Sequence, residues 1–230
     1  MLKLHTRTLL ASLCLAAAFV WSGCKSQPPT QPLLRGANSS LTSFAEFQIG
    51  QQWRYVKWEK FRDQDRKLTG DSVVVTIIAK ENDRITLQER FIPATTQEPA
   101  DTLTFNLRHE GSRLRLVGNL TARVFSFLSS HDGVLLLTPV DSNRVAINLD
   151  DSLFDLRQET GKNHFVGHSE AVQLFLQSYE DLTVYYDERI TYVDGNGHVA
   201  LFSAEKGVVG TVFFGGFSLF EQYGFELIKP

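Results

Sequence analysis

The chain has 230 residues, of which 43% are hydrophobic and 21% charged, with 23 basic and 26 acidic side chains and a formal net charge of −3. This length and apolar content favour a single domain with a sizeable core. The acidic balance argues against nucleic acid as a partner, because phosphate binding needs clustered lysine and arginine.

The first 23 residues (1–23) have the pattern of a secretory signal. Lys3 and Arg7 form a short basic segment, and an apolar run follows from Leu9 to Val20. That run is too short to cross a bilayer as a helix, which takes about 20 residues. The basic-then-apolar order is typical of an export signal that is removed. Its removal leaves 21 basic and 26 acidic residues, a net charge near −5.

The segment 21–24, Trp-Ser-Gly-Cys, resembles a bacterial lipobox, in which small residues precede a cysteine that is lipidated and becomes the new N-terminus. Trp21 stands where that motif usually has leucine. An ordinary signal cut near Ala18 is the alternative. It would leave Cys24 as a lone exposed thiol in an exported protein, because Cys14 is removed with the signal. We therefore predict lipidation of Cys24, with acyl chains such as palmitate that each contribute about 0.8 kcal/mol per buried methylene.

The residues after the cysteine predict a flexible tether and a location in the cell envelope. In enteric bacteria an aspartate directly after the cysteine favours the inner membrane, so by resemblance Lys25 indicates the outer membrane. Residues 24–43 are rich in Ser, Gln, Pro, Thr and Asn, and such a flexible coil would span roughly 25 Å. We expect a lipid-anchored protein of the bacterial cell envelope that meets the membrane through this N-terminal lipid.

From residue 44 to 230 the sequence predicts one β-rich domain, because apolar and polar residues alternate. The clearest runs are Val73-Val75-Ile77, Leu103-Phe105-Leu107, Val145-Ile147-Leu149 and Leu182-Val184-Tyr186. Turn-forming residues at 81–83, 131–133, 194–197 and 215–216 separate the runs. We expect about ten to twelve antiparallel strands in a strongly curved sheet, a half-open barrel or a sandwich.

One segment, at about 168–179, departs from the alternation and predicts a single amphipathic helix laid on the sheet. Ser169 follows Gly167 and can cap a helix. The apolar residues of its predicted face recur at helical spacing: Val172, Phe175, Leu176 and Tyr179.

The segment Phe47-Gln-Ile-Gly-Gln-Gln-Trp-Arg-Tyr55 resembles a motif of exported bacterial proteins and lipoproteins, F-x-(L/I)-G-x-x-W-x-Y, which comes soon after the tether. Gln48 stands where that family commonly has proline. Those proteins often end with a glycine-led strand and a last strand, and Gly207–Val212 and Phe225–Ile228 look similar. The resemblance implies an envelope location and a β fold, and it assigns no activity.

The aromatic residues of this motif have a structural interpretation and a functional one. Gly50 permits a tight entry turn, and Trp53 and Tyr55 share one face of a strand. Val56 and Trp58 then point to the opposite face, which predicts a bulge or a strand covered on both sides. Burial in the core is the favoured interpretation, because large aromatics dominate core packing. The alternative is a ligand-binding platform for carbohydrate formed by the three large aromatics, Trp53, Tyr55 and Trp58.

His164 and His168, followed by Glu170, are the candidate metal ligands. Two histidines four apart on a helix share a face and can bind zinc. Gly167 lies between them, however, and the predicted helix begins only after the second. We therefore interpret them as ordinary loop histidines and predict no metal or other cofactor.

An acidic cluster lies at 150–159 and comprises Asp150, Asp151, Asp155 and Glu159. Paired carboxylates can serve acid–base chemistry or hold calcium. Here they fall in a polar connection, where solvated carboxylates are common. The sequence contains no Gly-Lys-Ser/Thr loop, no Gly-x-Ser-x-Gly elbow and no Gly-rich dinucleotide signature.

Runs that are apolar on both faces, such as 73–78 and 208–214, need two apolar neighbours. One is the core, and the other is a helix, a ligand or a partner. We therefore predict a non-catalytic envelope protein that binds an apolar ligand or a partner protein, in a groove lined by phenylalanine and leucine, or that has a structural role. The alternative is a membrane-anchored hydrolase or metalloenzyme using His164, His168 and the acidic cluster.

Overall fold

The computed structural model describes residues 44–61, 64–95, 100–120, 122–138, 143–147, 164–190, 195–215 and 221–228. These all belong to the second of two units into which the chain divides, Met1–Gly36 and Ala37–Pro230. The predicted signal peptide, Cys24, the tether and the acidic cluster therefore lie outside the described residues. No helix within the described ranges is long and apolar enough to cross a membrane.

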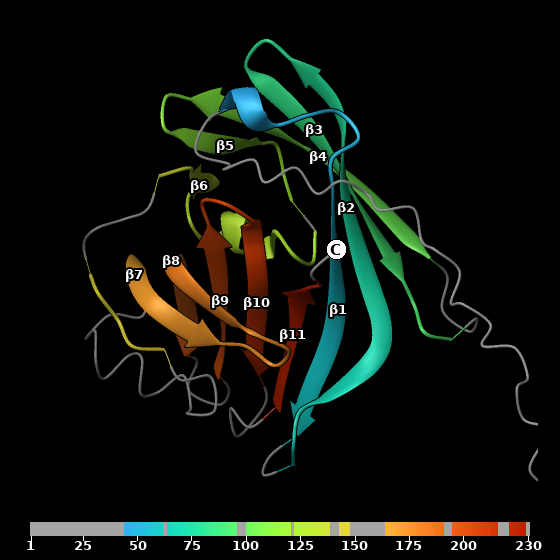
Figure 1. Cartoon of the computed structure of the whole chain (residues 1–230), viewed down its shortest axis with the longest axis vertical. Helices are drawn as coiled ribbons and strands as arrows, with labels where there is room; N and C mark the ends of the chain where they lie inside the picture. Colours follow the sequence, from blue (N-terminus) through green and yellow to red (C-terminus); the bar gives the residue numbers. More distant parts are fainter. Residues whose placement is uncertain are drawn as a thin grey trace, which may run out of the picture. The chain divides into compact units, whose positions relative to one another are not determined.

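The described residues form an antiparallel sheet of eleven strands with two short 3-10 helices, η1 and η2 (Figure 1). The predicted mainly β, antiparallel fold is confirmed, and the sheet is not closed. The elements are η1 (Phe44–Glu46), β1 (Gln52–Phe61), β2 (Lys67–Glu81), β3 (Arg84–Ile92), β4 (Asp101–Glu110), β5 (Arg113–Val117), η2 (Ser126–Ser129), β6 (Val134–Leu136), β7 (His164–Gln173), β8 (Ser178–Ile190), β9 (Gly195–Ser203), β10 (Gly207–Gly215) and β11 (Glu221–Leu227).

Strands that neighbour one another in the sheet also neighbour one another in the chain, with one exception. The order is β6-β5-β4-β3-β2-β1-β11-β10-β9-β8-β7, so β1 pairs with β11. This pairing runs from Tyr55 opposite Leu227 to Phe61 opposite Glu221 and joins an N-terminal meander to a C-terminal one. The outer strands β6 and β7 are the edges, and Arg144 adds a single parallel bridge to His168 on β7.

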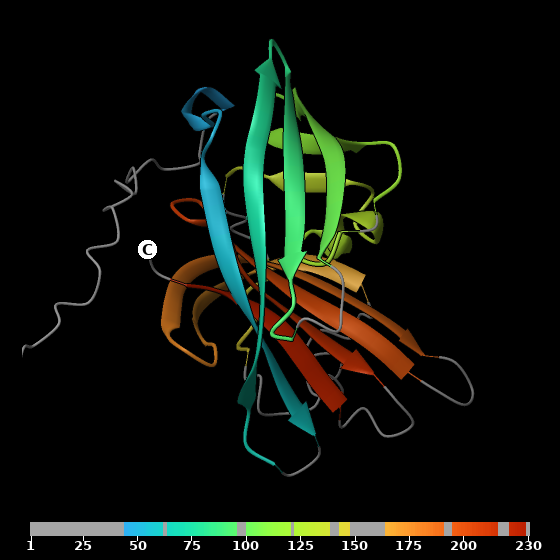
Figure 2. The ribbon, with the colours of Figure 1, turned by 90° about the vertical axis from the view of Figure 1, so that its right-hand side faces the viewer.

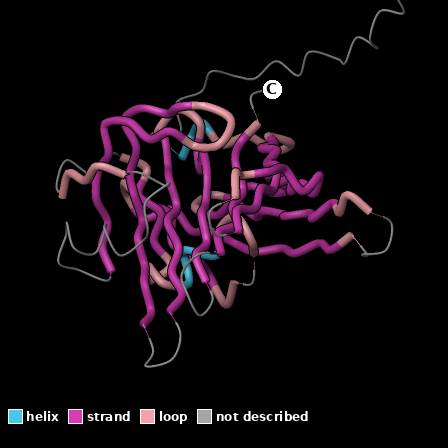
Figure 3. The backbone as a smooth tube through the Cα atoms, turned by 90° about the horizontal axis from the view of Figure 1, so that it is seen from below, coloured by secondary structure: helices cyan, strands magenta, loops and turns pink. Residues whose placement is uncertain are grey.

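The two meanders face each other across the interior. Strands β1 and β2 run through both halves, with β3 and β4 beside one end and β11 and β10 crossing at the other (Figure 2). Seen from below, the strands curve around the interior (Figure 3). The Tyr185 hydroxyl on β8 accepts a hydrogen bond of 2.7 Å from the Leu136 backbone N–H on β6, which connects the two halves.

The register of β1 against β2 shifts between Val56 and Trp58, but the extra residues lie in β2, between Leu68 and Ser72, and β1 stays in register with β11. Of the two predictions for this segment, the strand covered on both sides is therefore the one that the structure supports. Tyr55 and Trp58 are both fully buried, and Trp53 is half-buried. The three aromatics therefore do not form an exposed carbohydrate platform. The turn at Gly50 is also as expected, because this glycine has a φ of 87°.

Burial follows the expected alternation in part of the sheet only. Val73, Val75 and Ile77 on β2 are buried between more exposed neighbours. On β8 and β10, by contrast, consecutive residues are buried, from Leu182 to Tyr186 and from Gly207 to Val212. This part of the sheet is therefore covered on both faces, as the doubly apolar run at 208–214 predicts. The same prediction for the run 73–78 is wrong, because Val74 is half-buried and Ile78 is 41% exposed.

The predicted helix at 168–179 is wrong. These residues form the end of β7, a turn closed by the Leu174 N–H donating to Gln177 O at 3.0 Å, and the start of β8. The buried face of β7 changes by one residue between Ser169 and Val172, next to Asp181 on β8, whose φ is 54°. Val172 and Tyr179 are paired opposite one another, and Phe175 and Leu176 lie in the turn between them, so a tight hairpin gives these four residues the spacing of a helix face.

The packing of the Trp58 ring requires a glycine at position 224, directly opposite it in β11. A Cβ at Gly224 would lie 2.6 Å from the Trp58 ring and 2.5 Å from Thr211 O, both far inside normal contact. We expect Gly224→Ala to lower the free energy of unfolding by about 1–3 kcal/mol, because the crowded indole cannot move away within a filled core. Gly215→Ala is the control, since a Cβ there meets nothing within 4 Å. Urea denaturation of both variants tests this, and an equal effect on the two would contradict it.

Candidate functional site

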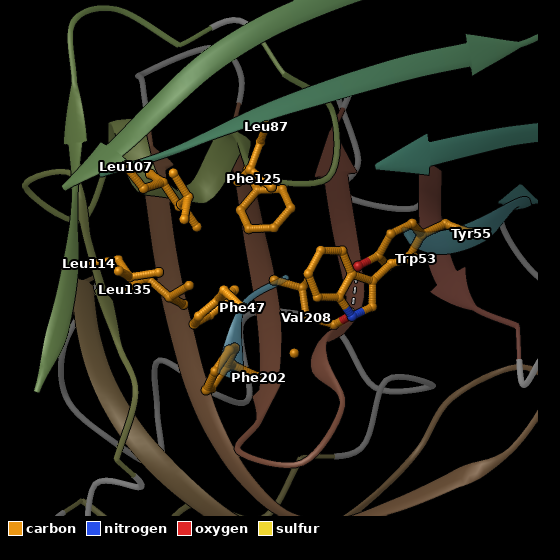
Figure 4. Close-up of a pocket in the computed structure, with 12 residues that line it drawn as sticks. Phe47, Trp53, Tyr55, Leu87, Leu107, Leu114, Phe125, Leu135, Phe202 and Val208 are labelled. Atoms are coloured by element: carbon orange, nitrogen blue, oxygen red, sulfur yellow. Dashed lines mark hydrogen bonds between the residues drawn. The ribbon is translucent and has the colours of Figure 1, made fainter. Parts of the chain in front are cut away.

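The interior between the two meanders contains a small apolar cavity of about 20 Å³ (Figure 4). Leu107, Leu114 and Leu135 lie on one side of it, and Trp53 and Tyr55 lie on the other. The remaining wall includes the apolar side chains Phe47, Leu87, Phe125, Phe202 and Val208. Phenylalanine and leucine thus dominate the lining, and a space of this size has room for about one water molecule. The interior is nearly filled.

The polar atom of Tyr55 in the cavity wall is satisfied within the protein. Its hydroxyl donates a hydrogen bond of 2.9 Å to Val208 O, which ties β1 to β10. Burial raises the pKa of Tyr55 well above its ordinary value, with smaller contributions from Glu89 and Tyr179. The tyrosine is therefore neutral at physiological pH, and none of the residues that line the cavity is charged.

The segment Ala122–His131, which contains η2 and which we call the plug, fills the space beside the cavity. Phe125 packs on Phe105 of β4 with ring centroids 5.4 Å apart. Phe127 packs on Tyr185 of β8 at 4.8 Å. The plug therefore makes aromatic contacts with both halves of the sheet and occupies space that an open sheet would leave to solvent or a ligand.

A buried carboxylate fixes the start of the plug. Glu89 on β3 is only 1% exposed, and its two oxygens accept hydrogen bonds from the backbone N–H groups of Arg123, at 2.6 Å, and Val124, at 3.0 Å. Burial raises the pKa of Glu89, and these two bonds oppose the rise only in part. The Arg123 guanidinium lies on the Phe91 ring and 3.2 Å from Asp101, which adds an outer attachment.

A lysine holds the residue that covers the cavity from the N-terminal side. Lys80 Nζ donates hydrogen bonds to Phe47 O at 2.9 Å and Ala45 O at 3.2 Å. These bonds fix the short η1 segment and direct Phe47 into the cavity. In both covers, the plug and Phe47, backbone atoms of a short irregular segment are hydrogen-bonded to an ionisable side chain of the sheet. That side chain is Glu89 for the plug and Lys80 for Phe47.

A group of polar residues lies on β7, β8 and β9, on the face of the sheet that also forms part of the cavity wall. His164, Asp187 and His198 are directly opposite one another on β7, β8 and β9. His198 is four residues from Phe202 on β9, so both point to the same side of the sheet. His131, at the end of the plug, packs on His164 with ring centroids 4.3 Å apart and on His198 at 6.2 Å. We call His131, His164, Asp187 and His198 the histidine cluster.

The electrostatics of the histidine cluster follow from its burial. Burial, together with smaller contributions from the neighbouring His164 and His198, lowers the pKa of His131 to about 3, so this ring is neutral at physiological pH. Burial alone would raise the pKa of Asp187, but hydrogen bonds from His164 and Ser130 hold it below its ordinary value. The cluster therefore combines neutral imidazole with an ionised carboxylate.

The structure separates the metal ligands that the sequence suggested. His164 and His168 both lie on β7, four residues and therefore about 13 Å apart, too far for parallel side chains to share one ion. His168 Nδ1 is 3.6 Å from Asp181, and Glu170 pairs with Arg144 at 3.0 Å. Of the three candidates, only His164 belongs to the histidine cluster. Within the described ranges no group of three or more His, Cys, Asp or Glu side chains could hold a metal ion.

Sequence reasoning missed Glu89, His131, Asp187 and His198. No local motif connects them, because they come from β3, the plug, β8 and β9. The available signal was a polar side chain in an otherwise buried run, such as Asp187 following Leu182–Tyr186.

Comparisons with known proteins add little. No family model matches the chain, and no curated protein matches it. Among solved structures, the chain is similar to the dehydratase domain from the CurK module of curacin polyketide synthase, with 8% identity and a TM-score of 0.18 over 80% of this chain and 76% of that one. A TM-score this low supports no argument about fold or function.

Glu89→Gln tests the attachment of the plug. A carboxamide offers one oxygen to two buried N–H groups, so we expect the free energy of unfolding to fall by about 1–3 kcal/mol. Because burial raises the pKa of Glu89 above 4.5, the folded state takes up the proton more readily than the unfolded chain. Glu89 therefore stabilises the folded protein most at a pH near or below 4.5, the ordinary pKa of the unfolded chain. This stabilisation is lost as the pH rises through the higher pKa of the folded state.

The measurement is urea unfolding of both proteins at about pH 5 and pH 8, with exposed Glu180→Gln as the control. The difference between the wild type and Glu89→Gln should be larger at the lower pH. A difference that grows with pH would contradict the assigned environment of Glu89.

Proposed function

We propose that this protein is a lipid-anchored bacterial envelope protein that binds an apolar chain, such as a lipid acyl chain, without catalysing a reaction. The lipobox-like cysteine and the polar tether support the anchor, and Lys25 supports the outer membrane as its location. The observation that carries the binding function is the apolar cavity lined by phenylalanine and leucine between the halves of an unclosed sheet.

The size of the cavity sets a condition on binding. About 20 Å³ is too small for an acyl chain, so the chain must displace the plug, Phe47 or both. Each cover is a short irregular segment whose backbone is hydrogen-bonded by a side chain of the sheet, Glu89 for the plug and Lys80 for Phe47. An entering chain replaces the displaced aromatic contacts with its own buried methylenes, which contribute about 0.8 kcal/mol each.

The alternative, an anchored hydrolase or metalloenzyme using His164, His168 and the acidic cluster, has weaker support. The two histidines are about 13 Å apart along β7, and the acidic residues lie outside the described ones. A partner protein remains the second candidate for the apolar interior, because a partner's side chain could enter by the same route.

Trp53 provides a direct test of acyl binding. After the predicted cleavage the chain retains two tryptophans, Trp53 in the cavity wall and Trp58 in the core. We expect a saturable change of Trp53 emission when a palmitoyl amphiphile is titrated into the Trp58→Phe protein. Leu135→Phe should weaken this binding about tenfold by filling the cavity, whereas Ile78→Phe, at an exposed position, should not.

A fluorescence change that does not saturate, or equal effects of Leu135→Phe and Ile78→Phe on the affinity, would refute acyl binding at this cavity. Native mass spectrometry of the protein purified from an envelope should also show co-purified lipid.

The anchor is tested separately. Protein isolated from bacterial membranes should begin at Cys24 and carry the mass of added acyl chains, and Cys24→Ala should release it from the membrane fraction. A mature chain that begins near residue 19 with a free thiol would refute the anchor and leave the cavity test unaffected.

A further inference from the structure

The cavity lies at the end of the sheet where β1, β3 and β5 begin. Its lining includes the second residue of each of these strands, Trp53, Ile85 and Leu114. The η1 segment lies at this same end (Figure 1), and Phe47 follows it in the chain. Phe47 lines the cavity from this side and is 5% exposed. One aromatic side chain therefore covers the cavity at this end.

Two isoleucines are exposed beside Phe47, and we call Ile49 and Ile78 the isoleucine pair. Ile49 is 65% exposed, and Ile78 is 41% exposed. The Gly50 N–H donates a hydrogen bond of 2.8 Å to Ile77 O, so the pair flanks a direct contact between the turn after Phe47 and β2. Single exposed apolar residues are common, but two of them beside the cover of an apolar cavity form a surface for an apolar partner.

The predicted tether joins the domain at this same end. Residues 24–43 directly precede η1, which begins at Phe44, and Ile49 is only five residues further along the chain. A flexible tether of this length keeps the domain near the membrane at an effective concentration in the millimolar range. A contact with a dissociation constant of about 1 mM, too weak to hold a free protein on a membrane, is half-occupied at such a concentration.

A second pair of exposed hydrophobic residues lies at the opposite end of β1. Phe61, the last residue of β1, is 44% exposed, and Leu68, near the start of β2, is 49% exposed. Strand β1 has ten residues and is therefore about 33 Å long. If this far end met the bilayer, the tether would have to extend beyond its r.m.s. span of roughly 25 Å. The isoleucine pair is therefore the favoured contact, and Phe61 and Leu68 provide a matched control.

We propose that the isoleucine pair inserts into the surface of the bilayer to which Cys24 is anchored, and that the acyl chain enters the cavity from that bilayer past Phe47. This inference rests on the proposed function, since it needs both the anchor and the acyl ligand. An acyl chain on this route moves from lipid to the isoleucine pair and then to the place of the Phe47 ring, without crossing water. Lys80 bonds the backbone oxygens of Ala45 and Phe47, so the ring can rotate outward while the segment stays attached.

The first test measures the position of the isoleucine pair in the mature lipoprotein, reconstituted in vesicles of phosphatidylethanolamine and phosphatidylglycerol. Cys14 has then been removed and Cys24 carries the lipid, so Ile49→Cys, Ile78→Cys and Leu68→Cys each introduce the single thiol that can carry a nitrobenzoxadiazole probe. We expect the probes at positions 49 and 78 to shift their emission to the blue and to be quenched by spin-labelled lipid. The probe at position 68 should behave as it does in water.

The second test measures the entry route by the transfer of a fluorescent acyl chain from the same vesicles. The double variant Ile49→Ser/Ile78→Ser should take up the chain about tenfold more slowly, because it loses most of the apolar area that inserts. Phe61→Ser/Leu68→Ser should match the wild type. Equal rates for the two double variants would overturn the entry route, and so would water-exposed probes at positions 49 and 78 or equal quenching at position 68.

Failure of the proposed function gives different results. An unmodified Cys24, read from the intact mass, would refute the anchor and the membrane contact together. A lipidated chain with water-exposed probes would refute the membrane contact alone. The Trp53 titration uses an amphiphile in solution and no vesicles, so a loss of acyl binding there would refute the ligand and with it the entry route, whatever the probes show.

Discussion

The pairing of β1 with β11 holds the two meanders of the described sheet together. It is the single long-range strand pairing among the described strands, and it converts two local meanders into one sheet of eleven strands. Tyr55 and Trp58 stand on opposite faces of β1, and both are fully buried. The Tyr55 hydroxyl reaches β10, and the Trp58 ring lies against Gly224 of β11. The motif that looks like a family signature is thus the junction between the halves.

Buried carboxylates attach irregular segments to this sheet in two places. Glu89 accepts the backbone N–H groups at the start of the plug, and Glu226 accepts those of Leu176 and Gln177 in the turn between β7 and β8, at 2.8 and 3.1 Å. Burial raises the pKa of both carboxyl groups. Backbone N–H groups that no strand can satisfy are thereby paired, which lets short turns cover the faces of a sheet without long helices.

The cavity and the histidine cluster both follow from the way in which the plug fills the sheet. An unclosed sheet has an apolar inner face that must be filled, and the plug fills it with Phe125 and Phe127 while placing His131 beside β7 and β9. The cavity remains where the plug does not fill the interior completely, and the histidine cluster lies at the last residue of the plug, His131. Displacement of the plug would therefore open the cavity.

The local features of the fold could be predicted from the sequence. Alternation at 73–77 and 103–107 and the turns at 82–83 and 131–133 depend only on neighbouring residues. The folded sheet settled where the apolar residues at 168–179 belong, because Val172 pairs with Tyr179 across a tight turn that gives the same spacing as a helix face. It also decided the candidate sites. Residues from four separate segments meet only after β1 and β11 pair, and no local pattern encodes a contact made across 150 or more residues.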